Sequence, residues 1–128
     1  MNDIINKLEE DILNIYNPND SFAHPTEQKI PIRNFIDYFK RRCGSSEYEI
    51  IYTIKLMYRF MERLNHFINR LNVHKLFLVS FILSYKLIRD RPIKNTWYST
   101  VTNLNINVLN ELEKEFLTKL DWDIYISV

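Results

Sequence analysis

The supply of turn residues constrains the fold of this chain more than any other feature. The 128 residues include one glycine, Gly44, and four prolines. A protein of many β-strands needs a tight turn every few residues, and glycine is common in those turns. The sequence therefore favours helices joined by a few longer connections. The hydrophobic content of 46% is that of a folded globular chain, and the length fits one domain.

Apolar residues recur at helical spacing in five or six segments. Pro31 suits the first turn of a helix, and Gly44 suits a helix end. Ser46 and Glu49 have the spacing of a capping box, which begins a helix at residue 47. Asn72 can cap the helix after it. The pattern predicts helices over residues 3–16, 31–43, 47–66, 73–89 and 96–102, and a last helix that begins after Asn103 or Asn105 and ends at Trp122.

The segment at residues 76–85 carries no charge. It has about half of the roughly 20 residues that a membrane-spanning helix needs, so it predicts a buried helix in the middle of a bundle. The first residues lack the basic start and apolar stretch of a signal peptide. Cys43 is the single cysteine and has no partner for an internal disulfide. We expect an intracellular protein of the cytoplasm or nucleus that does not bind membranes.

Charge and motifs argue against several functions. The 17 basic and 16 acidic residues leave a net charge of +1, which disfavours a dedicated nucleic-acid binder. His24, His66 and His74 lie in different segments without the spacing of metal ligands, so we expect no metal and no cofactor. The sequence shows no nucleophile elbow, no glycine-rich phosphate loop and no pair of catalytic carboxylates. We therefore predict that the chain is not an enzyme.

Two charged residues lie where the helical pattern favours another kind of residue. Glu113 falls in the middle of the apolar stripe of the last helix, and an unpaired buried carboxylate is costly. It must lie at the edge of the stripe, pair within the chain or bind a partner molecule. Lys75 falls in the first turn of the fourth helix, where the helix dipole favours an acid. By itself, its simplest interpretation is a side chain that extends to solvent.

Three segments resemble the cyclin box: HKLFLVSF at residues 74–81, NTWYSTV at 95–101 and LNELEKEFLTKLDWDI at 109–124. In order and composition they are similar to the short P/U-type cyclins, which include the fungal phosphate-regulating ones. Residues 30–43, which begin Ile-Pro-Ile and end in cysteine, resemble the opening of that box. The resemblance covers residues 22–128 and implies an all-α, five-helix cyclin box. An N-terminal amphipathic helix and linker, at residues 1–21, would precede it.

The resemblance also implies a function. Cyclins bind a cyclin-dependent protein kinase and hold its mobile regulatory helix in the active position. They use a lysine that opens one box helix and a glutamate in another, which correspond here to Lys75 and Glu113. Apolar contacts carry over to Leu117, Trp122 and Ile124. We expect these residues to bind the kinase and the chain to be a monomer without it.

Two alternatives remain open. The first is a cyclin-fold adaptor that binds other proteins without activating a kinase, and loss of Lys75 or Glu113 would have been its sign. The second is a transcription-factor-type module that binds nucleic acid or polymerase. It would need two boxes or a basic face, and the sequence shows neither.

Overall fold

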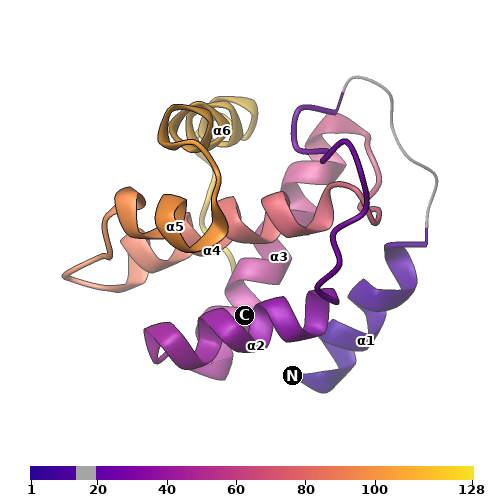
Figure 1. Cartoon of the computed structure of the whole chain (residues 1–128). Coiled ribbons are helices and arrows are strands. Elements are labelled where there is room, and N and C mark those ends of the chain that lie inside the picture. The colour runs from indigo at the N-terminus through magenta and orange to yellow at the C-terminus, as the bar shows by residue number, and fades with distance from the viewer. Residues whose placement is uncertain (14–19) are drawn as a thin grey trace.

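The computed structural model describes residues 1–13 and 20–128. Within these residues the chain forms six α-helices and no β-strand, apart from one isolated bridge between Leu13 and Asn69. The all-α fold predicted from the sequence is confirmed. The helices are α1 (Asn2–Asp11), α2 (Ile32–Cys43), α3 (Glu47–Leu64), α4 (Val73–Ile88), α5 (Asn95–Thr102) and α6 (Ile106–Lys119) (Figure 1).

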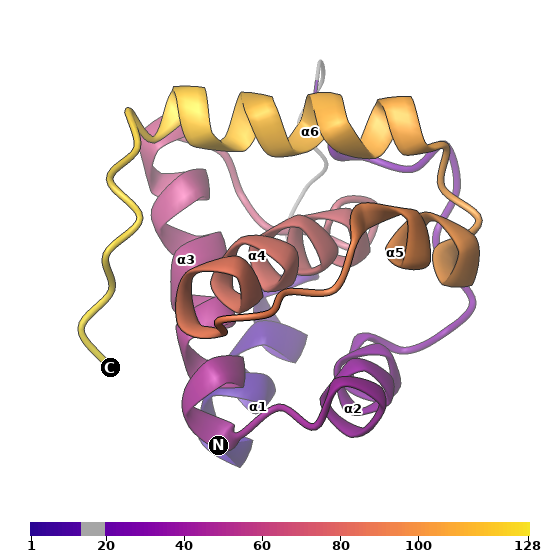
Figure 2. The same cartoon turned by 90° about the vertical axis from the view of Figure 1, so that its left-hand side faces the viewer.

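Helix α4 lies in the middle of the bundle, as its apolar sequence predicted. Helices α2, α3 and α6 all pack against it (Figures 1 and 2). Every residue from Val73 to Tyr85 is buried except Lys75. The Ser84 hydroxyl donates to the Ser80 carbonyl at 2.7 Å, so this buried polar group has a partner inside the helix. Among the described residues, no helix combines the length and apolar character that a membrane span requires.

Local signals set several helix ends as predicted. The Ser46 hydroxyl accepts from the Glu49 amide, and the Glu49 carboxylate accepts from the Ser46 amide, which completes the capping box of α3. Gly44 ends α2 with φ of 63°, a conformation that glycine adopts at little cost. The Asn105 side chain accepts from the backbone amides two and three residues later and caps α6.

Two predictions, one for the end of α1 and one for the start of α4, were wrong. Helix α1 ends at Asp11, and Ile12 and Leu13 follow outside it; residues 14–16 of the predicted range lie outside the described residues. Asn72 precedes α4 but its side chain does not cap the helix. Its Oδ1 accepts from the Asn69 amide, and its Nδ2 donates to Asp20 at 2.6 Å. The side chain therefore fixes the loop before α4 rather than the first turn of the helix.

Helix α6 ends earlier than the predicted Trp122. Its last residue is Lys119, and Asp121 and Trp122 follow with φ of 53° and 61°. The Trp122 amide donates back to the Leu117 carbonyl at 3.0 Å, which closes the turn. Because these left-handed conformations redirect the backbone, the last residues leave the helix axis and descend beside α3 (Figure 2).

An aromatic cluster joins the segment before α2 to α3 and α6. Phe60 and Phe116 stack with their ring centroids 4.2 Å apart. Phe22 packs edge-on against both, at 5.2 Å and 6.2 Å. All three side chains are fully buried. Large aromatic rings contribute much of the apolar area in a core, so this cluster fixes the position of α6 across the bundle.

Candidate partner-binding surface

Glu113 has its partners within the chain. Its Oε1 lies 2.6 Å from Nζ of Lys86, in the last turn of α4. Its Oε2 accepts from Nδ2 of Asn95, the first residue of α5, at 2.9 Å. The Glu113 side chain is 14% exposed and that of Lys86 is 38% exposed. Internal pairing is therefore the interpretation that the structure supports, and it joins three helices at one point of the surface.

Lys75 lies in a different environment. It is half-buried at the wall of a cavity of about 350 Å³ between the first turn of α4, the end of α5 and the segment before α2. Within the described residues it forms no ion pair. Burial lowers the pKa of the Lys75 ammonium, and the negative charge of Asp20 opposes that shift. Lys75 thus keeps a charge that the described part of the chain does not neutralise.

The structure does not pair Lys75 with Glu113. Lys75 and Lys86 are eleven residues apart on α4, which places them about 16 Å apart along the helix axis. Glu113 is bonded to Lys86, at the far end of that helix. Lys75 therefore lies at the start of α4, whereas Glu113 contacts the end of that helix. The contact is made through Lys86, a residue that the sequence analysis missed.

The apolar candidates lie at the end of α6. Leu117 is partly buried and packs against the core, whereas Trp122 is 66% exposed. Ile124 is partly buried, and its backbone carbonyl accepts from the Tyr52 hydroxyl. Leu117 before Trp122 and Ile124 after it are therefore held against the core, while the Trp122 side chain extends into solvent.

Residues after α6 are held along α3 by polar contacts that the sequence analysis missed. Arg63 forms an ion pair with Asp123 at 2.7 Å, and Arg59 donates to the Tyr125 carbonyl. The two arginines lie four residues apart on α3, so both face the same side of the helix. That spacing was a visible signal, but it did not indicate which segment the arginines would bind. The contacts fix the chain on the C-terminal side of Trp122.

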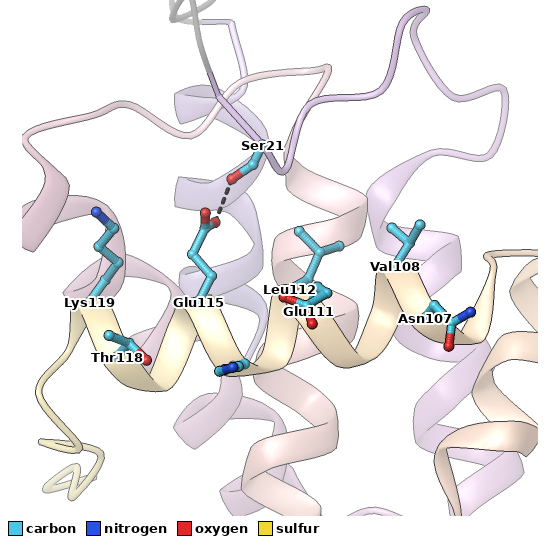
Figure 3. Close-up of a pocket in the computed structure, with 9 residues that line it drawn as sticks. Ser21, Asn107, Val108, Glu111, Leu112, Glu115, Thr118 and Lys119 are labelled. Carbon is cyan, nitrogen blue, oxygen red and sulfur yellow. Dashed lines mark hydrogen bonds between the residues drawn. The ribbon is translucent and has the colours of Figure 1, made fainter.

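An open groove runs along α6, beside the segment that contains Ser21. It has a volume of about 620 Å³, and Figure 3 shows Val108 and Leu112 at its base. Ser21 crosses above it and donates a hydrogen bond to Glu115. None of the five candidate residues lines this groove. In the described chain, no group of three or more His, Cys, Asp or Glu side chains could hold a metal ion.

Comparison with known proteins identifies the family. The model of the family described as Cyclin matches residues 5–124. The chain belongs to the cyclin family. The match begins inside α1 and includes all the later helices, and the similarity to a cyclin box seen in the sequence is confirmed.

The relatives are plant and fungal cyclins. Cyclin-U3-1 of Arabidopsis thaliana is 30% identical over 77% of this chain and 45% of its own length. Cyclin-U4-3 of the same plant is 28% identical over 84% of this chain and 50% of its own. PHO85 cyclin-6 of Saccharomyces cerevisiae is 35% identical over 44% of this chain and 14% of its own. The chain spans about half the length of the plant relatives, and the predicted likeness to short U-type and fungal cyclins is confirmed.

Proposed function

We propose that this chain is a regulatory subunit that binds and activates a cyclin-dependent protein kinase and performs no chemistry itself. Membership of the cyclin family supports this, as do the relatives named U-type cyclins and PHO85 cyclins. In such kinases a strand lysine must pair with a glutamate of the regulatory helix before phosphoryl transfer. A subunit that makes more contacts with the active position of that helix shifts the equilibrium toward it.

The exposed indole of Trp122 is the observation that carries the proposal. A bulky residue is uncommon at positive φ, yet Trp122 has φ of 61° and a side chain that is 66% exposed. Neither the backbone conformation nor the exposure stabilises the isolated chain. Tryptophan is the residue type most enriched at the energetic centres of protein interfaces. Burial of this indole by a partner would explain both its positive φ and its exposure.

We assign the remaining contacts around Trp122. Leu117 and Ile124 would extend the apolar surface at the end of α6, because both are partly buried and held in place by the core. Glu113 would act together with Lys86, as a bonded pair in which Lys86 is the more exposed member. Lys75 would contact the kinase separately, from the other end of α4.

Substitution of Trp122 tests the proposal. The kinase is first recovered from cell extract with the chain as bait, and its affinity is then measured by calorimetry. Trp122→Gly should weaken binding by about thirtyfold or more, the effect of removing an interface hot spot of about 2 kcal/mol. The free energy of unfolding should stay unchanged or rise, because glycine relieves the positive φ and the indole buries little surface.

Two further variants make this result specific. Trp122→Ala should lose affinity to the same degree, since it also removes the indole. Tyr38→Ala removes a partly exposed aromatic of α2, on the opposite side of the bundle from α6 (Figure 2), and should bind the kinase normally. Full affinity of both Trp122 variants would refute the assigned surface, and recovery of no kinase would count against the function itself.

A further inference from the structure

The cavity beside Lys75 collects basic side chains from separate parts of the chain. Lys75 and His74 come from the first turn of α4, and His24 comes from the segment before α2. The end of α5 and the residues after it close the other side, where Asn103 has φ of 57°. The cavity has a volume of about 350 Å³ and no acidic residue in its lining. Three basic groups thus line one partly open cavity.

The three basic groups are close enough to influence one another. The charges of Lys75 and His74, together with burial, lower the pKa of His24 to about 4. Burial is the larger cause. The pKa of His74 is also lowered by burial, while a hydrogen bond from its Nε2 to the Ile30 carbonyl opposes the shift. Both histidines are therefore neutral at pH 7, and Lys75 supplies the positive charge.

The surrounding acids do not neutralise the cavity. Asp20 acts on Lys75 and Glu27 acts on His74, but neither lines the cavity or forms an ion pair with these groups. Asp20 instead accepts a hydrogen bond from Asn72. A half-buried ammonium without a counter-charge is costly, and an anion in the cavity would supply that charge.

We propose that this cavity binds a phosphate group. Lys75 can donate up to three hydrogen bonds, and His24 and Asn103 carry further N–H donors, which suits an anion with several oxygens better than a single carboxylate. The first turn of α4 adds the positive end of the helix dipole, whereas the end of α5 opposes it over a much shorter helix. His74 is 7% exposed and its Nδ1 has no hydrogen-bond partner, so a protonated His74 could also donate.

Titration with two oxyanions tests the site on the chain alone. Sulfate and inorganic phosphate are added while the ring protons of the histidines are followed by NMR. Saturable shifts of the His24 and His74 signals are expected with both ions. Because sulfate keeps its charge between pH 4 and pH 7.5, its affinity should rise as the pH falls toward the lowered pKa of each histidine and the rings gain protons. Phosphate gains a proton in the same range, so its affinity should rise less steeply.

Matched variants separate a built site from general attraction. Lys75→Met should lower sulfate affinity by about tenfold or more, the scale of one charge-assisted contact in a partly enclosed site. His24→Asn should flatten the pH dependence while leaving binding at pH 7.5 nearly unchanged. Lys114→Met removes the same charge from an exposed position on α6 and should have no effect. Equal losses for Lys75→Met and Lys114→Met, or shifts that never saturate, would overturn the proposal.

A comparison of two phosphate esters then identifies the source of the group. Glycerol phosphate represents small metabolites, and phosphoserine with both ends blocked represents a phosphorylated protein. Both should bind if the cavity reads the phosphate group itself, and the tighter one indicates the natural source. Failure of both esters while sulfate binds would overturn the assignment to phosphate and leave an adventitious ion only. The site shares Lys75 with the proposed kinase surface, but these measurements contain no kinase, so either proposal can fail without the other.

Discussion

Exchanging the charges of Lys86 and Glu113 tests whether the kinase reads this pair or only needs the fold that it supports. Glu113→Lys alone places a second ammonium where Lys86 Nζ now lies 2.6 Å from the carboxylate. A partly exposed ion pair contributes about 0.2–1 kcal/mol, and like charges cost a similar amount. The single variant should therefore lower the free energy of unfolding by about 1–2 kcal/mol, measured by urea denaturation.

The double variant Lys86→Glu with Glu113→Lys restores an ion pair of reversed sense. The buried Oδ1 of Asn95 has no hydrogen-bond partner, so it can accept from the new ammonium at position 113. An acid in the last turn of α4 opposes the helix dipole by about 0.3–1 kcal/mol. We expect the double variant to recover most of the lost stability and to remain within about 1 kcal/mol of the original chain.

Binding gives the decisive comparison. If the negative charge of Glu113 is part of the kinase surface, the double variant should bind at least about tenfold more weakly, a loss of about 1.4 kcal/mol. The single variant should be at least as weak. Calorimetric titration with the kinase measures both. Recovery of full affinity in the stable double variant would refute the reasoning, because it would assign Glu113 to the fold alone and remove it from the kinase surface.

Two further predictions concern the stability of the fold. Hydrogen bonds from Arg89 are the largest cause that lowers the pKa of Glu49. A lowered carboxyl pKa stabilises the fold at any pH above the unfolded pKa of about 4.3. This stabilisation is lost as the pH falls through the folded pKa. Between pH 6 and pH 3 the free energy of unfolding should therefore fall less in Glu49→Gln than in the original chain, and an identical fall would contradict the cause given. Asn105→Ala removes the cap of α6 and should cost about 1 kcal/mol in urea denaturation, whereas Asn107→Ala, an exposed position in the same helix, should cost nothing.

The helices were predictable because their signals are local. The spacing of Ser46 and Glu49, the glycine at position 44 and the apolar run of α4 each act within a few residues, and all three gave the observed structure. The errors arose where a local group found a distant partner. Asn72 has the chemistry of a helix cap, but its amide binds Asp20, 52 residues away, and no spacing rule along one helix predicts that contact.

The same distinction explains what was predictable of the candidate site. Lys75 and Glu113 were found from sequence because each disagrees with the pattern of its own helix. Their surroundings depend on how the helices cross, and periodicity within a helix carries no information about crossing. The ion pair between Lys86 and Glu113 and the cavity around His24 follow from such crossings. The left-handed turn at Trp122 could not be predicted either, because apolar residues continue at helical spacing past Lys119, where the helix ends.

Glu113 and Lys75 looked alike in the sequence, yet the structure makes them chemically unequal. Glu113 is bonded to Lys86 and Asn95, so its charge is compensated before any partner arrives. Lys75 has no ion-pair partner among the described residues, and its cavity has no acid in the lining. An external anion would therefore gain more at Lys75, where it replaces no existing bond, than an external cation would gain at Glu113, where it must compete with Lys86. For this reason we expect Lys75→Met to affect ligand binding more than folding, and Glu113→Gln to affect both.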